Sequence, residues 1–281
     1  MKSAVTRTWY RIALAAPSGP PVLVEAQGEH LGVAIAAAQH HVERSRAIAC
    51  EVAPDGPLGE SVGRNQVIDL GPANDVAGFA WPVGVLPQLG ATAQLAEAKR
   101  GWVHHESEKL FVLEAQTEAD QLVDLYLGMV ERLPAADNLE IRVLDHFDDA
   151  GQTDVWLTAR VNAKQIIRFL DDHDTDLIDN GHVELSIYVR KHKATLRLTE
   201  HKTVVWIADT PELEADVKRW FGELGVTRVP QLVPISRVPH YHYRSAKTRD
   251  RKKLSEQLYR QRLRKVDTLR PALPPPADTD G

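Results

Sequence analysis

The chain has 281 residues, of which 43% are hydrophobic and 26% are charged, a composition typical of a soluble globular protein with one large or two ordinary domains. No run approaches the roughly 18–20 apolar residues of a membrane span, and the N-terminus has no apolar signal core, so we expect a cytoplasmic protein without a membrane partner. Cys50 is the only cysteine, which excludes a disulfide within the chain and fits a reducing compartment.

The formal net charge of −5 is unevenly distributed along the chain. Residues 237–270 contain twelve Lys and Arg against three Asp and Glu, a net charge of +9. Residues 1–236 carry −12, and the last eleven residues carry −2. An acidic body with a basic C-terminal arm is therefore the compositional feature that points to a function.

Residues 1–100 are predicted to form a small α+β domain of the ββαβ type. Thr8–Leu14 and Pro21–Ala26 are predicted strands joined by a Pro/Gly turn, and the apolar spacing in Glu29–Val42 predicts a helix. Ala47–Val52 is a third predicted strand, and Gln66–Leu70 can add a further one. The glycine- and proline-rich residues 71–92 predict a packed connector without regular elements, so we place the domain boundary near residue 100.

Residues 101–230 predict a second domain with the element order β-α-ββ-α-βββ-α. Hairpin-length breaks join most neighbouring strands, which favours an antiparallel sheet over a parallel one. The fold class that we predict is therefore α+β, with two two-layer domains, largely antiparallel sheets and helices packed on one face. The predicted elements that precede residue 180 are a strand at Leu110–Ala115, a helix capped by Thr117, strands at 139–143 and 155–161, and a helix capped by Asn162.

The best-defined part of this second domain follows residue 182. Apolar and polar residues alternate with a period of two through Val183–Ala208, and Lys191-His192-Lys193 and Glu200-His201-Lys202 interrupt them, which predicts a three-stranded meander. Thr210 is the predicted cap of the next helix, and Gly225 is its predicted end.

Residues 231–281 predict a basic arm and a tail. His240-Tyr241-His242-Tyr243 precedes Arg244–Arg264, which has only a thin apolar edge and is predicted to form a mostly solvated helix. The prolines from Pro271 onward predict a disordered tail.

The basic arm is the feature to which we assign binding. Lysines and arginines neutralise phosphates, and tyrosines stack on unpaired bases, so the arm is predicted to bind nucleic acid or another polyanion. The same cations could instead dock on an acidic protein partner or on the acidic body of the chain itself. The predicted binding residues are Arg244, Lys247, Arg249, Arg251, Lys252, Lys253, Tyr259, Arg260, Arg262, Arg264 and Lys265.

Asp172, His173, Asp174 and Asp176 form the densest cluster of potential metal ligands. The alternating aspartates resemble the start of a calcium loop, but such a loop needs glycine at its sixth position, where Leu177 stands. A transition-metal site that combines His173 with acidic residues or His146 in 145–149 is a second reading, and a solvated acidic helix end is the simplest one.

Two further patterns carry weaker signals. Gly59-Glu60-Ser61-Val62-Gly63 matches the hydrolase nucleophile elbow, which needs a strand before it and a helix after it, and neither is predicted here. His240 and His242 would share one face of a strand, whereas His104 and His105 would point to opposite faces. The pair at 240 and 242 is thus the better ligand pair, but nothing nearby in the sequence supplies a third ligand.

The sequence contains no phosphate-binding loop, dinucleotide fingerprint or Cys-His zinc spacing, and we predict no cofactor. We therefore expect a non-enzymatic adaptor protein whose basic arm engages nucleic acid or another polyanion. One alternative is a protein–protein assembly or inhibitor module, of the kind represented by immunity proteins, that uses the acidic surface at 145–149 and 171–176. A metal-assisted hydrolase is the other alternative.

Overall fold

The computed structural model describes residues 7–53, 67–74, 76, 78–105 and 109–269. The predicted proline-rich tail and the Gly-x-Ser-x-Gly pattern around Ser61 lie outside the described residues. The described part is a mixed α+β structure, as predicted, and its paired strands are antiparallel throughout the named sheets.

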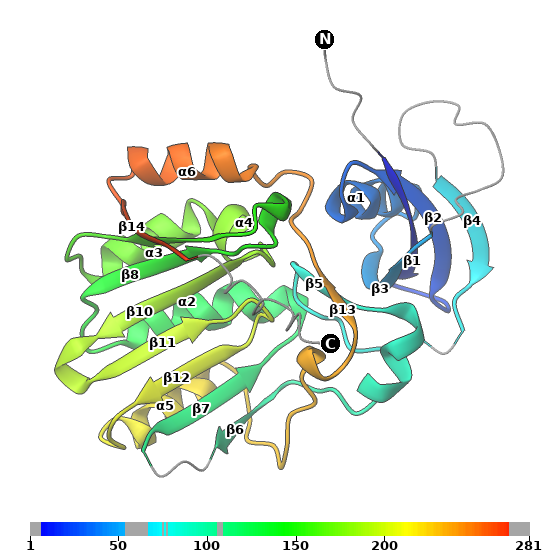
Figure 1. Ribbon diagram of the computed structural model, residues 1–281. Helices are drawn as coiled ribbons and strands as arrows, with labels where there is room; N and C mark the ends of the chain where they lie inside the picture. Colours follow the sequence, from blue (N-terminus) through cyan, green and yellow to red (C-terminus); the bar gives the residue numbers. More distant parts are fainter. Residues whose placement is uncertain (1–6, 54–66, 75, 77, 106–108, 270–281) are drawn as a thin grey trace, which may run out of the picture.

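The N-terminal part forms a four-stranded antiparallel sheet in the order β3-β1-β2-β4 with one helix packed on it (Figure 1). Leu31 and Ile35 of the helix pack with Val24 of the central hairpin because these side chains repeat at helical spacing on one face. The elements predicted from the sequence are all present: β1 (Thr8–Ala15), β2 (Val22–Gly28), α1 (Leu31–His41), β3 (Arg46–Val52) and β4 (Val67–Pro72).

The larger part is built on an eight-stranded antiparallel sheet in the order β14-β9-β8-β10-β11-β12-β7-β6. The predicted meander is confirmed: Leu185 pairs with Leu198 and Leu196 pairs with Trp206, so the apolar residues of the three strands share one face. The strands are β6 (Gly101–His105), β7 (Phe111–Gln116), β8 (Asn138–Val143), β9 (Thr153–Leu157), β10 (Val183–Val189), β11 (Ala194–Leu198), β12 (Val204–Ala208) and β14 (Arg264–Leu269).

Helices α2 (Leu122–Arg132), α3 (Ala163–Asp171) and α5 (Glu214–Glu223) cover the apolar face of this sheet (Figure 1). The predicted Asn162 cap of α3 is present as a reciprocal pair with Gln165. Helix α5 begins at Glu214 rather than at the predicted Thr210, because the intervening residues form a turn. No helix of the described residues has both the length and the apolar character needed to cross a membrane.

The connector predicted to be irregular contains a strand that joins the two sheets. Strand β5 (Val85–Pro87) pairs with β13 (His240–His242), and we call these two strands the strap. The strap lies between the N-terminal sheet and the large sheet (Figure 1). Leu86 and Tyr243 are buried in the apolar core under α1. The chain therefore returns to its own N-terminal part before the basic arm begins.

The basic arm is not one long solvated helix. Helix α6 (Arg251–Arg260) is followed by β14, which pairs with β9. Leu254 and Leu258 are almost completely buried in the core of the large sheet, so the apolar edge of the arm is a packing face. The prediction of a helix through residue 264 was wrong because Arg262 adopts a left-handed backbone conformation that ends the helix.

The remaining short elements connect these layers. They are η1 (Leu89–Leu95), η2 (Ala119–Gln121), η3 (Phe147–Asp149), α4 (Asp174–Leu177), η4 (Arg190–His192) and η5 (Ile235–Arg237).

Gly181 provides a test of the contact between the strap and the sheet. A Cβ atom at this position would collide with the backbone of Gly84 and crowd the amide of Tyr243. We expect Gly181→Ala to lower the free energy of unfolding by about 1–3 kcal/mol, the usual cost of overpacking. Urea unfolding followed by tryptophan fluorescence measures this change in the free energy of unfolding.

Gly222→Ala is the matched control for this substitution. Gly222 lies in α5 with open space where its Cβ would be, so the change should raise stability by about 0.5–1 kcal/mol. Equal effects of the two substitutions would contradict the close approach of the strap.

Candidate metal centre

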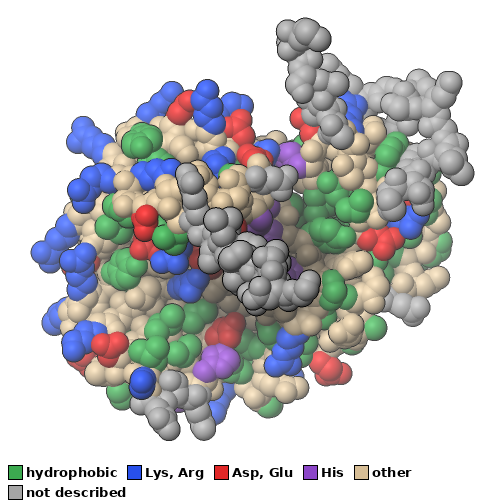
Figure 2. All heavy atoms as spheres, viewed as in Figure 1, with side chains coloured by type: hydrophobic (Ala, Val, Ile, Leu, Met, Phe, Trp, Pro, Cys, Tyr) green, Lys and Arg blue, Asp and Glu red, His purple; other side chains and the backbone are tan. Residues whose placement is uncertain are grey.

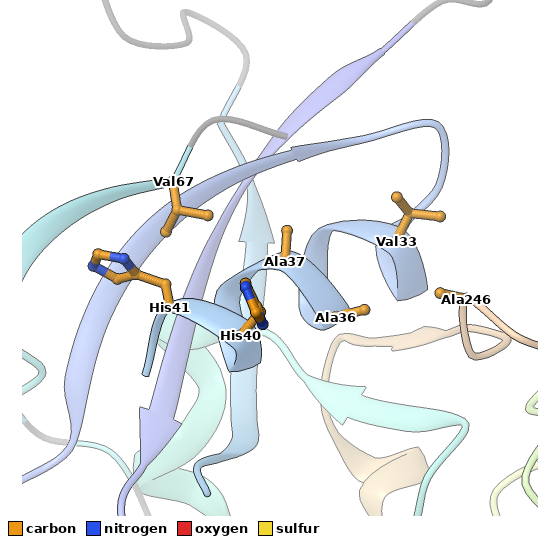
Figure 3. Close-up of a pocket in the computed structure, with 7 residues that line it drawn as sticks. All are labelled: Val33, Ala36, Ala37, His40, His41, Val67 and Ala246. Carbon is orange, nitrogen blue, oxygen red and sulfur yellow. The ribbon is translucent and has the colours of Figure 1, made fainter. Parts of the chain in front are cut away.

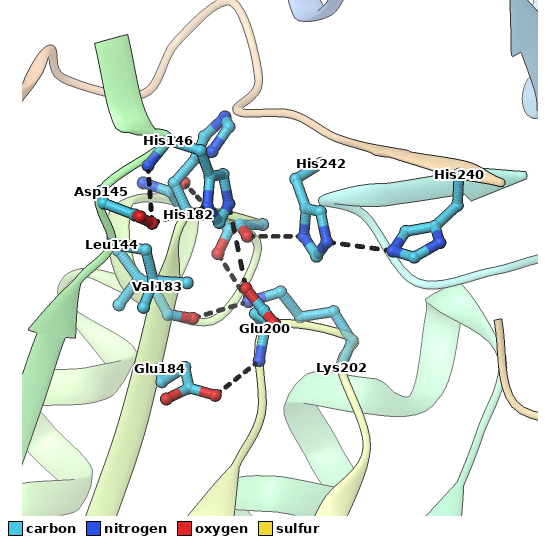
Figure 4. Close-up of polar contacts among 12 residues, drawn as sticks. Leu144, Asp145, His146, His182, Val183, Glu184, Glu200, Lys202, His240 and His242 are labelled. Atoms are coloured by element: carbon cyan, nitrogen blue, oxygen red, sulfur yellow. Dashed lines mark hydrogen bonds and ion pairs between the residues drawn. The ribbon is translucent and has the colours of Figure 1, made fainter. Parts of the chain in front are cut away.

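Five histidines gather where the strap meets the ends of the large-sheet strands. They come from four separate segments: His146 follows β8, His182 precedes β10, His201 lies in the β11–β12 turn, and His240 and His242 belong to β13. Figure 4 labels four of them, His146, His182, His240 and His242. The ring of His242 lies 4.9–5.1 Å from the rings of its neighbours His146, His201 and His240, measured between centroids. The fifth ring, of His182, lies 4.9 Å from that of His146.

His240 and His242 are held so that their Nε2 atoms face one another at 3.1 Å (Figure 4). The Nδ1 atom of His240 bonds the carbonyl of Val238 at 2.7 Å, and that of His242 bonds the carbonyl of Gly181 at 2.9 Å. Because a carbonyl only accepts, both Nδ1 atoms carry the proton in the neutral rings. Two Nε2 lone pairs therefore point at each other, and a cation between them would satisfy both.

His201 completes a set of three imidazoles. One ring nitrogen from each of His201, His240 and His242 lies within 4.8 Å of the others. Nitrogens bound to one tetrahedral ion at about 2.0–2.1 Å are separated by about 3.3 Å, so modest side-chain rotations bring this set onto one ion. No pattern in the sequence identified this third ligand, because His201 lies in a polar break between two strands.

A second set shares His242. A nitrogen of His146, a carboxylate oxygen of Glu200 and a nitrogen of His242 also lie within 4.8 Å of one another. Since Nδ1 of His242 is bonded to Gly181, only its Nε2 is free for an ion. The two sets therefore describe one ion position with alternative partners, and His146 or Glu200 can approach its fourth side.

Burial keeps two of the ligands, His201 and His242, in the neutral form that binds metals. Desolvation lowers the pKa of His242 to about 3 and that of His201 to about 4, with neighbouring histidines adding to the effect. Desolvation raises the pKa of Glu200 above its usual value. At neutral pH His201 and His242 thus offer imidazole lone pairs rather than imidazolium charges.

Lys202 supports the loop that orients His242. Its side chain is only 1% exposed, and its Nζ atom donates to the carbonyls of Asn180 at 2.5 Å and Val183 at 3.1 Å (Figure 4). Burial lowers the pKa of this ammonium to about 7. Because Gly181 lies between the two bonded carbonyls, Lys202 fixes the loop whose carbonyl accepts the proton of His242.

A cavity of about 410 Å³ opens beside the centre. Figure 2 shows histidine side chains in the hollow between the large sheet and the N-terminal sheet. His146 and His242 belong to this cavity wall as well as to the ligand sets, so a bound ion would be accessible to a small molecule. The N-terminal part contributes Tyr10, Glu29 and His30 to the opposite wall.

The acidic cluster predicted as a metal site does not converge. Asp176 is buried and accepts hydrogen bonds from the backbone and the guanidinium of Arg249. Asp174 bonds the amide of Thr175, and His173 contacts Gln257. Among the described residues, the groups of three converging ligands are the two that share His242.

The cations of the arm divide into an inward and an outward group. Arg251 and Lys265 bind Asp154 at 3.1 and 2.7 Å, and Arg244 lies 3.4 Å from Asp148. With Arg249 on Asp176, these cations are paired with carboxylates of the acidic body, and Lys253 lies 3.2 Å from Asp250 at the start of its own helix. Between Arg244 and Leu269, the cations that are exposed and have no ion pair are Lys247, Lys252, Arg260, Arg262 and Arg264.

Other histidines do not assemble a site. His104 and His105 lie on β6 and are exposed, and His105 pairs with Glu114 at 2.7 Å. A cavity of about 630 Å³ lies along α1, where Figure 3 shows His40 and His41 beside small apolar side chains. This wall offers two imidazoles but no carboxylate, so it lacks the convergence seen at His242.

No family model, curated protein or solved structure matches the chain. Its function is therefore inferred from the geometry of the centre itself.

Lys202→Met tests the supporting role of the buried ammonium. The change keeps the length of the side chain but removes the donor, so the loop at residues 180–183 loses its restraint. We expect Co²⁺ affinity to fall about 10–100-fold, as for other groups that orient metal ligands. Isothermal titration with Co²⁺ measures it, and Lys253→Met, an exposed lysine on α6, is the control. Unchanged affinity in a folded Lys202→Met protein would contradict the role.

Proposed function

We propose that the protein is a metal-dependent hydrolase whose ion is held by His201, His240 and His242. The strongest support is that the Nε2 atoms of His240 and His242 lie 3.1 Å apart. In both rings Nδ1 already donates to a backbone carbonyl. Two neutral imidazoles in this arrangement cannot bond each other, whereas both can bind a cation. Backbone carbonyls on the outer nitrogens are also the usual support of metal-binding histidines.

The ligand chemistry selects a zinc-type ion. Imidazole nitrogens suit zinc and neighbouring transition metals, while calcium and magnesium prefer oxygen ligands. Three protein ligands with an open fourth position are typical of catalytic zinc sites, and structural sites are closed by a fourth protein ligand. Here the fourth side faces His146, Glu200 and the 410 Å³ cavity.

The residues around the open side fit a hydrolytic reaction. A bound zinc-type ion supplies a water molecule of lowered pKa, which can attack an ester or amide. Glu200 is the proton acceptor in this proposal, because its carboxylate lies beside the ligand nitrogens and burial raises its pKa above the ordinary value. Glu200, once protonated, would pass this proton to the leaving group. Its Oε2 atom lies 3.9 Å from Nε2 of His146, which flanks the same side of the site.

Metal analysis with paired histidine variants tests this function. We expect one equivalent of Zn²⁺ or Co²⁺ per wild-type chain, and loss of binding in the His240→Ala/His242→Ala double variant. The His104→Ala/His105→Ala double variant is matched in composition but lies on an exposed strand, so it should bind normally. Elemental analysis and the Co²⁺ absorption spectrum give the readouts.

Activity follows as a second readout of the same proteins. Hydrolysis of p-nitrophenyl acetate or bis(p-nitrophenyl) phosphate should disappear with a chelator and return with Zn²⁺. Absence of metal binding by the wild-type protein, or equal binding by both double variants, would contradict the proposal.

A second candidate function rests on the outward cations of the arm. Lys252, Arg260, Arg262 and Arg264 are exposed, and the side chain of Tyr259 is 60% exposed between them. Figure 2 shows Lys and Arg side chains gathered along the side that carries α6 and β14. We propose that this basic surface binds single-stranded nucleic acid, with backbone charge neutralisation and stacking on Tyr259 as the source of affinity.

The salt dependence of binding tests this second candidate. Replacing Lys252, Arg260, Arg262 and Arg264 by Gln should reduce the slope of log affinity against log salt by about 3, since each phosphate contact contributes about 0.7 for a single strand. The control replaces four other exposed cations, Arg44, Lys191, Arg228 and Arg237. Fluorescence anisotropy with labelled RNA and DNA measures binding, and an equal slope in both variants would argue against the surface.

The assembly or inhibitor alternative gains no support from the contacts. Asp148 and Asp176 belong to the acidic surface assigned to a partner, and both are engaged by Arg244 and Arg249 of the same chain.

A further inference from the structure

The cavity beside the centre contains an unusual number of unsatisfied polar atoms. Nδ1 of His30, Nε2 of His146 and Nδ1 of His182 are buried and have no hydrogen-bond partner. All three histidines line the same 410 Å³ cavity. Buried polar atoms are normally paired, so three of them around one void indicate that a polar ligand completes their hydrogen bonds.

Arg244 supplies a permanent positive charge to the same wall. Its side chain is only 16% exposed, and its guanidinium lies 5.6 Å from the ring of Phe147. Nη1 donates to the carbonyl of Thr248 at 3.1 Å, and Nη2 reaches Asp148 at the long distance of 3.4 Å. A guanidinium has five N–H donors, so this rigidly held group keeps donors for a ligand.

Asp148 pairs with Arg244 only at the long distance of 3.4 Å, so it offsets part of this charge and leaves the rest for a ligand. Asp148 accepts a hydrogen bond from the backbone amide of Arg251 at 3.2 Å on its second oxygen, so both of its oxygens have partners. Glu29 is exposed to solvent. Nδ1 of His146 faces Asp145 at 3.3 Å, so its Nε2 is not a donor in the neutral ring. The donors available on this wall are the guanidinium of Arg244 and the unpartnered Nδ1 atoms of His30 and His182, and an oxyanion is the ligand that accepts from all of them.

We infer that the cavity binds a small organic oxyanion, either a phosphoryl or a carboxylate group of the substrate, with Arg244 as its specificity-determining cation. This inference rests on the proposed hydrolase, because the anion would lie beside the open side of the ion. Leu31, Val52 and the two tyrosines Tyr10 and Tyr241 give the cavity an apolar and aromatic wall for the remainder of the substrate. The volume is that of a small-molecule site.

Anion titration of the Co²⁺-loaded protein tests the inference. Inorganic phosphate and acetate are added separately, and the Co²⁺ absorption spectrum and calorimetry report binding. We expect at least one of them to bind, and the stronger of the two identifies the class of oxyanion. Arg244→Gln should weaken it about tenfold or more, because a charge-assisted hydrogen bond is lost, while Co²⁺ affinity stays the same. Arg237→Gln, at an exposed arginine outside this cavity, should leave anion affinity unchanged.

His30→Phe is a second variant that keeps a ring but removes the nitrogens, and it should weaken the anion severalfold. If Arg244→Gln does not fold, the anion affinity of His30→Phe tests the site in its place. Failure of wild-type protein to bind Co²⁺ would overturn the proposed hydrolase. Normal Co²⁺ binding without anion binding, or with anion affinity equal in wild type, Arg244→Gln and His30→Phe, would overturn the oxyanion site alone.

Discussion

The structure depends on the backbone contact between the strap and the loop before β10. Tyr243 donates its amide to Gly84 at 2.8 Å and accepts from the amide of Gly181 at 3.0 Å. Two glycines meet here because any side chain would hold the backbones apart. The carbonyl of Gly181 also accepts the Nδ1 proton of His242. One contact thus joins the two sheets and orients the central histidine, so the site and the fold form together.

This region retains features that are unfavourable for stability alone. The ammonium of Lys202 is buried with two carbonyls as its hydrogen-bond partners, and its backbone is left-handed. The neighbouring imidazoles are desolvated and leave nitrogens without partners. A chain under selection for stability alone would replace such groups by apolar residues, because buried unpaired polar atoms each cost free energy. Their concentration around His242 is the pattern expected where function constrains the sequence.

Local patterns in the sequence predicted the strands and the ligand pair His240 and His242. The period of two places Leu185, Leu196 and Trp206 on one face, and the same rule places His240 and His242 side by side. The third ligand could not be predicted, because His201 reaches the pair only through the tertiary contact of the β11–β12 turn with the strap. The distribution of charge along the sequence likewise revealed the basic arm, but it could not show which of its cations face inward and which face outward. Arg251 and its carboxylate partner Asp154 are 97 positions apart, so only the fold brings them together.

The division of the arm explains how one basic segment can serve two sides of the molecule. Its inward cations replace solvent around buried carboxylates such as Asp154, whose side chain is 4% exposed and would be costly without a partner. This docking fixes the segment that carries Arg244 against Phe147, and so forms one wall of the cavity beside the metal ligands. The outward cations do not contribute to that wall and remain exposed on α6 and before β14. The net charge of the segment therefore combines a structural share, which pairs with the acidic body, with a share of similar size that is exposed to solvent.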